Sequence, residues 1–142
     1  MNSNQQKLKN KQYQHSYDWI SQFDPKWITD KIDDDAIIFA DKFGRFLKEN
    51  KMTTSQIRNF FGEIKRIQMN GFDKNISAFK LLKPKVAYSV GRETNAGKKQ
   101  ILAEFKKIFD LAHSYVKNPN HFENFVAFFE AILAYHKFYG GK

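Results

Sequence analysis

The sequence predicts an all-α fold, a single-domain bundle of five or six helices, and three observations support this class. Apolar residues recur at helical spacing in several long stretches, and no strand-like alternation persists anywhere. Only three prolines and seven glycines occur, and most of them fall between these stretches. A length of 142 residues suits one domain with one sizeable core, and no internal repeat is visible.

Residues 1–14 are polar and rich in Lys, Gln and Asn, so we expect a flexible leader that lacks the apolar core of a signal peptide. An aromatic segment around Pro25 follows, for which we predict one or two short helices docked on the body. Its side chains either join the core or form an exposed patch that binds a neighbouring subunit. We therefore divide the chain into residues 1–32 and a helical domain of residues 33–142. The apolar residues of the segment are Tyr17, Trp19, Ile20, Phe23, Trp27 and Ile28.

The first long helix is expected after the acidic run of residues 33–35. Apolar residues follow at helical spacing from Ala36 to Leu47. Acidic residues at a helix start complement the macrodipole and can cap the first turn. Three adjacent carboxylates could also suggest a metal site, but no further acidic or His ligand follows at a useful spacing. We favour the capping interpretation and predict no metal site.

The next helix begins at Thr53, with Gln56 three residues later in the capping-box pattern. A basic group on this helix lies roughly 135° from the centre of its apolar stripe. Gly62 falls within that basic face, where a glycine costs about 1 kcal/mol relative to alanine, so close approach of another backbone would explain it. The apolar stripe is Ile57, Phe60, Phe61, Ile64 and Ile67, and the basic group is Arg58, Lys65 and Arg66.

Three more helical stretches follow. Residues 76–90 contain Pro84, so that helix is either kinked or broken and restarted. Residues 91–97 read as a loop, and residues 98–116 as a helix. After a turn at residues 118–120, the stretch 121–139 has aromatic residues on more than one face. It is either the central helix of the bundle or partly an interaction surface.

No pattern of a catalytic site occurs in the sequence. There is no cysteine, and the four histidines form no metal-binding or catalytic spacing. We expect His113 and His136 to pack at helix surfaces. Lys98 follows Gly97, but the spacing of a phosphate-binding loop is missing. We therefore predict a protein that is not an enzyme and needs no cofactor. Because no apolar run approaches the roughly 20 residues of a membrane helix, we also expect a soluble, cytoplasmic protein with no membrane partner.

The net charge of +9 lies entirely in the middle of the chain. Residues 51–107 hold thirteen Lys and Arg against four acidic residues, whereas the segments before and after carry balanced charges. Such self-repulsion opposes compaction, so a polyanionic partner explains the excess.

The distribution of these cations over several elements suits a groove that follows a phosphate backbone better than base reading by one helix. For Arg58 and Arg92 an intramolecular salt bridge is the alternative. For Tyr88 we favour a place in the core over a role as a stacking platform. The candidate residues for nucleic-acid binding are Lys51, Arg58, Lys65, Arg66, Lys83, Lys85, Arg92, Lys98 and Lys99.

Two segments of this basic region carry a resemblance. Residues 53–61 read TTSQIRNFF, and residues 81–92 read LLKPKVAYSVGR. Together with the Phe-rich last helix they resemble the small subunit of type III-A CRISPR effector (Csm) complexes, over roughly residues 35–139. The resemblance implies an all-helical, non-catalytic subunit that stacks in several copies beside the guide-binding backbone of a ribonucleoprotein. It also implies guide RNA, target RNA and other subunits of the complex as partners, with contacts mainly to the nucleic-acid backbone.

Two other functions stay open. The segment of residues 53–61 could open a helix-turn-helix DNA regulator, which would prefer one duplex sequence and bind it as a symmetric dimer. Alternatively, the chain could be a pure protein-assembly module in which the aromatic residues bind and the charge only aids solubility.

Overall fold

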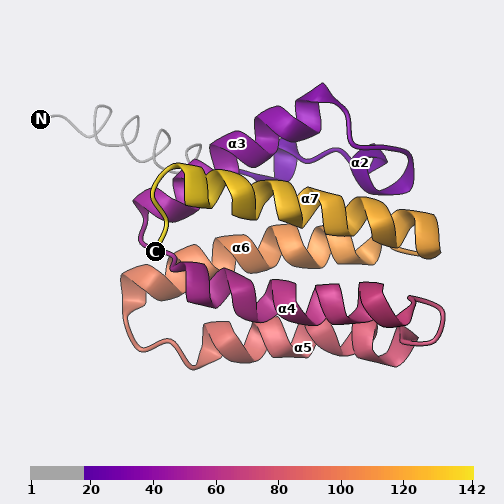
Figure 1. Ribbon diagram of the computed structural model, residues 1–142. Coiled ribbons are helices and arrows are strands. Elements are labelled where there is room, and N and C mark those ends of the chain that lie inside the picture. The colour runs from indigo at the N-terminus through magenta and orange to yellow at the C-terminus, as the bar shows by residue number, and fades with distance from the viewer. Residues whose placement is uncertain (1–17) are drawn as a thin grey trace, which may run out of the picture.

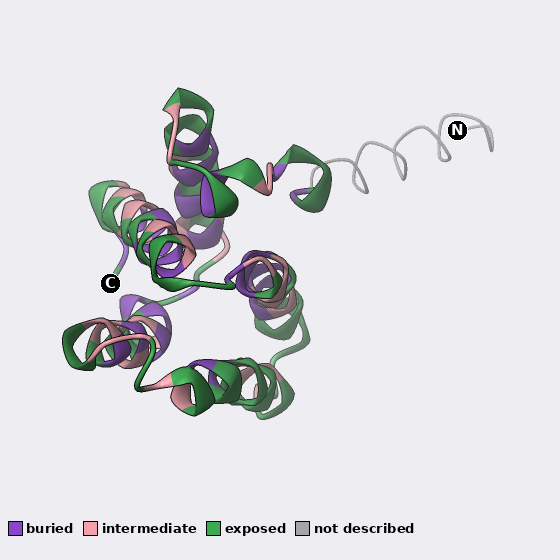
Figure 2. Cartoon of the chain, turned by 90° about the vertical axis from the view of Figure 1, so that its right-hand side faces the viewer, coloured by how far each residue is buried: buried purple, intermediate pink, exposed green. Residues whose placement is uncertain are grey.

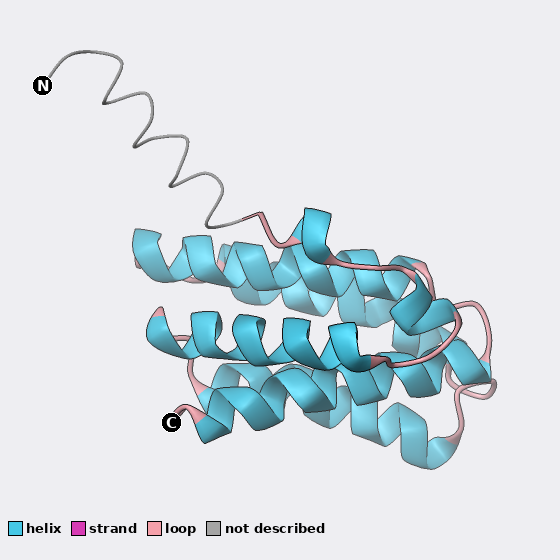
Figure 3. Ribbon diagram, turned by 90° about the horizontal axis from the view of Figure 1, so that it is seen from above, coloured by secondary structure: helices cyan, strands magenta, loops and turns pink. Residues whose placement is uncertain are grey.

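The computed structural model describes residues 18–142, which form helices joined by short loops (Figure 3). Within that range six α-helices and one turn of 3-10 helix occur and no strand, which confirms the predicted all-α bundle. The expected leader, residues 1–14, lies outside the described residues, and the division of the chain at residue 32 stays a prediction. The elements are η1 (Ile20–Gln22), α2 (Lys26–Thr29), α3 (Asp34–Glu49), α4 (Thr54–Asn70), α5 (Ile76–Gly91), α6 (Ala96–Ser114) and α7 (Pro119–Phe138).

Helix α7 is the central helix. It packs against α3 and α2 on one side and against α4 on the other, and α5 lies beside both α4 and α6 (Figure 1). Seen end-on, the buried residues of α4, α5, α6 and α7 face a shared interior (Figure 2). The interpretation of the last helix as central is therefore confirmed, although Phe138 at its end is 76% exposed.

Side-chain caps fix where the helices begin. The Asp33 carboxylate accepts a hydrogen bond from the Ala36 amide at 2.9 Å, as the capping interpretation of the acidic run predicted. Thr53 and Gln56 form the predicted capping box, with bonds of 3.2 and 2.9 Å. Helices α6 and α7 each begin two residues earlier than predicted, at Ala96 and Pro119, because Asn95 and Asn118 cap them.

Helix α5 runs unbroken through Pro84, so the alternative of a broken and restarted helix is wrong. Proline removes only one backbone N–H, which leaves the carbonyl of Lys80 without its helical donor. The buried side chains of Phe79, Leu82 and Val86 hold the turns on both sides of Pro84 against the core. Their packing offsets the local cost of the proline.

Aromatic rings fill the space between the helices. The ring of Phe125 on α7 lies 4.9 Å from that of Phe129 and 5.6 Å from that of Phe109 on α6. Phe60 of α4 stacks on Phe105 of α6 with centroids 5.4 Å apart. These bulky rings contribute both apolar burial and favourable ring geometry to the core.

The aromatic segment before α3 joins this core, as one of the two interpretations predicted. The Trp27 ring lies 5.3 Å from that of Phe39 on α3 and 6.0 Å from that of Phe128 on α7. Trp19, Phe23 and Ile28 are also buried, whereas Ile20 is exposed and Tyr17 lies outside the described residues.

His113 and His136 are both buried, so their expected place at helix surfaces is wrong. Each ring nitrogen Nε2 contacts a backbone carbonyl, that of Phe79 at 2.7 Å and that of Met52 at 2.6 Å. A carbonyl only accepts, so Nε2 carries the proton in both rings. Burial lowers the pKa of both imidazoles because it disfavours the charged form. Each neutral ring lies in the core and connects its own helix to a backbone carbonyl that is distant in the sequence.

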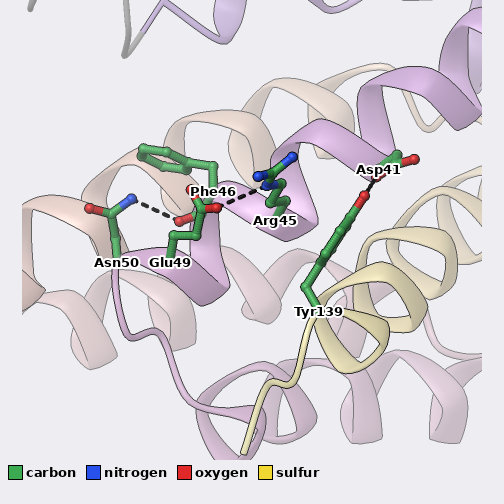
Figure 4. Close-up of polar contacts among 6 residues, drawn as sticks. All are labelled: Asp41, Arg45, Phe46, Glu49, Asn50 and Tyr139. Atoms are coloured by element: carbon green, nitrogen blue, oxygen red, sulfur yellow. Dashed lines mark hydrogen bonds and ion pairs between the residues drawn. The ribbon is translucent and has the colours of Figure 1, made fainter.

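Polar residues of α3 and of the end of α7 contact one another (Figure 4). The Tyr139 hydroxyl donates to the Asp41 carboxylate, a bond that raises the pKa of Tyr139. The Arg45 guanidinium lies 5.5 Å from the Tyr139 ring centroid and pairs with Glu49 at 2.8 Å. This cluster fastens the end of α7 to α3.

Candidate nucleic-acid interface

The nine candidate cations come from five parts of the chain, and all nine residues reach solvent. Eight of the nine residues are exposed, and Lys65 is half-buried. Seven of them make no ion pair within residues 18–142. Lys51 lies in the loop before α4, Arg58, Lys65 and Arg66 on α4, Lys83 and Lys85 on α5, Arg92 just after α5, and Lys98 and Lys99 in the first turn of α6.

The outer face of α4 brings together the three cations predicted to share it. Arg58 makes no ion pair among the described residues, so the alternative of an internal salt bridge is not observed there. The Lys65 ammonium lies 5.8 Å from the centroid of the Phe61 ring, a cation–π arrangement. An alanine Cβ at Gly62 would meet no atom within 4 Å. No neighbouring backbone within residues 18–142 therefore accounts for this glycine.

One carboxylate joins α4 to α5. Glu63 lies 3.4 Å from Arg66 on its own helix and 3.5 Å from Lys85 on α5. Both contacts are long, and the side chains of both cations are more than half exposed. Such pairs contribute little to stability, about 0–1 kcal/mol each. A single negative charge therefore holds two cations near each other and leaves the cluster positive.

A groove of about 580 Å³ runs between α4 and α5. A smaller hollow of about 100 Å³ continues it towards Arg92, and the two share Asn59, Phe60 and Ser89. Arg92 makes no ion pair within the described range either. The residues that line the larger groove are Asn59, Phe60, Glu63, Leu81, Pro84, Lys85, Tyr88 and Ser89. The groove therefore has apolar side chains along α5, with Lys85 on its lining and Arg92 on its continuation.

The remaining candidates lie apart from this groove. Lys83 on α5 lines neither hollow, and its charge adds to burial in lowering the pKa of His113 on α6. Lys51 and Lys98 line a separate hollow of about 380 Å³ between the α3–α4 loop and the start of α6. The concentration of charge in residues 51–107 predicts one continuous strip able to cradle a polyanion, whereas the structure places the candidates in three groups, on the outer face of α4, along the groove and at one end of the bundle.

Tyr88 does not belong to the core, so the favoured interpretation for this residue is wrong. Its side chain is 69% exposed and lines the groove. The buried stripe of α5 is centred on Phe79, Leu82 and Val86, and position 88 lies on a different side of the helix.

Within the described range no group of three or more His, Cys, Asp or Glu could hold a metal ion. No helix in that range is long and apolar enough to cross a membrane.

Comparison with known proteins identifies the family of this helical bundle. A family model described as Csm2 Type III-A matches residues 33–142. The chain belongs to this family. A curated relative from Streptococcus thermophilus, "CRISPR system Cms protein Csm2", is 34% identical over 115 residues, which cover 75% of this chain and 85% of the relative. No solved structure matches the chain.

Membership of the Csm2 family makes the chain a structural small subunit of a type III-A CRISPR complex, with the other subunits of that complex as partners. The two segments that carry the resemblance, residues 53–61 and 81–92, fold into the facing walls of the groove. Sequence analysis had not singled out Leu81, which is 55% exposed and lines the same groove. The sequence feature that could have identified Leu81 is its spacing of seven residues from Tyr88, because this spacing places both residues on one side of α5.

Proposed function

We propose that this Csm2 family member binds the backbone of guide and target RNA, without sequence specificity, through its basic α4–α5 side. In this proposal several copies stack along the guide–target channel of the type III-A complex. The subunit carries no catalytic activity, and it acts in the cytoplasm. Base pairing between guide and target selects the sequence, and the protein contacts mainly the nucleic-acid backbone.

The observation that carries the proposal is that the candidate cations are exposed and that most of them make no ion pair within residues 18–142. All nine reach solvent, and Glu63 is the one carboxylate within residues 18–142 that pairs with any of them. Cations arranged in this way attract a polyanion from solution and can neutralise phosphates. Arg58 and Arg92 offer planar forks for phosphate, and the lysines supply point charges.

The geometry gives no support to the helix-turn-helix alternative. Helices α4 and α5 lie side by side along most of their length, as Figures 1 and 2 show. A helix-turn-helix crosses its two helices at a large angle, so that one helix can enter the major groove alone. Here the exposed cations belong to both helices and to the loops at one end.

Salt dependence of RNA binding tests the proposal. If about five phosphates are contacted, log K for a single-stranded RNA falls against log salt with a slope of about −3.5. The double variant Arg58→Glu and Lys85→Glu should weaken RNA capture by the assembled complex. The double variant Lys26→Glu and Lys42→Glu is the control, because it makes the same charge change at two exposed residues of α2 and α3, on the other side of α7. Affinity that does not change with salt, or full RNA capture by the double variant, would refute the proposal.

A further inference from the structure

Three exposed apolar side chains lie in a row on α5 beside the basic face of α4. Tyr88 and Leu81 are more than half exposed, and Pro84 is exposed between them. Positions 81, 84 and 88 are separated by three and four residues, so they lie on one side of the helix. All three line the groove whose opposite wall is α4, and the buried Phe60 ring lies at its base.

The charges around this row determine which ligand suits it. Lys85 lies within the row, and Arg92 lines the continuation of the groove four residues beyond Tyr88. Arg66 reaches Glu63 from the α4 wall. From Leu81 to Arg92 the helix rises about 16 Å, which matches a few nucleotides and not a single small molecule. An exposed apolar patch bordered by cations fits a ligand that has apolar faces and repeated negative charge.

We propose that the groove takes an unpaired base of single-stranded RNA, stacked on the Tyr88 ring, while Lys85 and Arg92 contact the flanking phosphates. This inference rests on the proposed function and adds a preference for unpaired RNA. Every nucleobase has a flat face, so stacking on an aromatic side chain tolerates any sequence. In a duplex both faces of each base are already stacked, so a paired strand offers the groove only phosphates. An apolar side chain of a neighbouring protein would cover the apolar residues of the groove, but it would leave Lys85 and Arg92 without anionic partners.

The test uses the full chain and a single-stranded RNA that carries one 2-aminopurine. Stacking on Tyr88 quenches the fluorescence of this base when the protein binds. Tyr88→Ala should abolish the quenching and weaken binding by about fivefold to a hundredfold. Tyr88→Phe keeps a ring and should keep both properties. Because Tyr88 is exposed, the two variants should have the circular dichroism of the parent chain.

The salt slope separates stacking from charge. Tyr88→Ala removes no charge, so it should lower the affinity at every salt concentration and leave the slope unchanged. Lys85→Gln should instead reduce the magnitude of the slope by about 0.7. The unlabelled single strand should also compete better than the same strand paired with its complement, and Tyr88→Ala should remove that difference.

The outcomes separate this inference from the proposed function. If the parent chain binds RNA with a steep salt dependence but Tyr88→Ala binds equally well, the stacking site is refuted and the basic face stands. If Tyr88→Ala binds RNA normally but no longer joins the other subunits, the groove docks a protein and the inference is refuted. If the parent chain does not bind RNA, or binds it independently of salt, both proposals are refuted.

Discussion

Two glycines inside helices should respond to alanine in opposite ways. Gly44 lies within α3 and Gly62 within α4, so each substitution gains the same helix propensity, about 1 kcal/mol. Their surroundings differ. A Cβ at Gly62 would meet no atom within 4 Å, whereas a Cβ at Gly44 would lie 2.8 Å from the Ile132 carbonyl oxygen and 2.9 Å from the His136 backbone nitrogen. Both of these atoms belong to the backbone of α7.

The steric cost at Gly44 follows from this overlap. Helices α3 and α7 would have to separate, because neither backbone atom can turn away as a side chain would. Forcing an extra methyl group into a packed contact costs about 1–3 kcal/mol. We expect Gly62→Ala to stabilise the fold by about 1 kcal/mol. The two variants should then differ by about 1–3 kcal/mol, with Gly44→Ala the less stable, because the propensity gain cancels between them.

Urea unfolding measures this difference. With a slope of about 2 kcal/mol per molar urea, Gly62→Ala should raise the midpoint by about 0.5 M without changing the slope. Gly44→Ala should have a midpoint at least about 0.5 M below that of Gly62→Ala. If the two midpoints agree within about 0.2 M, the close crossing of α3 and α7 does not constrain position 44, and the packing argument is refuted.

The Gly62 variant also tests why a glycine stands on the basic face. Since nothing in residues 18–142 approaches it, an RNA backbone is a candidate for the close contact that the glycine would permit. A more stable chain with weaker RNA binding would support that reason. A more stable chain with unchanged RNA binding would remove it.

Two further predictions concern charge and pH. Glu63→Gln frees Arg66 for a further phosphate contact, whereas Lys85 already makes one in our proposal, so the salt slope of RNA binding should grow in magnitude by up to about 0.7. Asp35→Asn on α3, with the same charge change, should leave the slope unaltered. The lowered pKa values of His113 and His136 mean that the unfolded chain takes up protons first, near its ordinary pKa of about 6.5. The stability that the two neutral histidines contribute is therefore fully present above about pH 6.5. Below that pH the free energy of unfolding falls by up to about 1.4 kcal/mol per pH unit for each histidine. The urea midpoint of unfolding should fall between pH 7.5 and pH 5. His113→Gln should remove the part of this fall that His113 causes. A midpoint that does not change with pH would mean that the two rings have the same pKa in the folded and unfolded chain, which would refute the argument.

Local sequence signals predicted the helices well because caps and apolar stripes act within a few residues. Asp33 and the Thr53–Gln56 pair capped as expected, since each needs only a backbone amide three residues away. The starts of α6 and α7 were placed two residues late. Asn95 and Asn118 are caps as good as those before α3 and α4, but the loop and turn residues around them obscured the signal.

The site was harder to predict because it depends on which helices lie side by side. The grouping of Arg58, Lys65 and Arg66 could be derived from one helical wheel. The groove could not, because it requires α5 to lie against α4. The prediction for Tyr88 was wrong for a related reason. An aromatic residue close to the apolar stripe of a helix is expected in the core unless it is known which residues lie at the centre of that stripe. The burial of His113 depends on a carbonyl 34 residues away, which no local pattern reveals.

The separation of charge along the chain becomes a separation in space because of where α7 lies. Helices α4, α5 and α6 are consecutive and occupy one side of α7, whereas α2 and α3 occupy the other (Figure 1). The excess of +9 belongs to residues 51–107, and eight of these nine charges lie on α4, α5 and the part of α6 up to Lys107. The side formed by α2 and α3 comes from a segment with balanced charge. A bundle that interleaved the same helices would have mixed these charges around its circumference. This order of helices instead gives the molecule one positive side, towards which a polyanion is drawn before any specific contact forms.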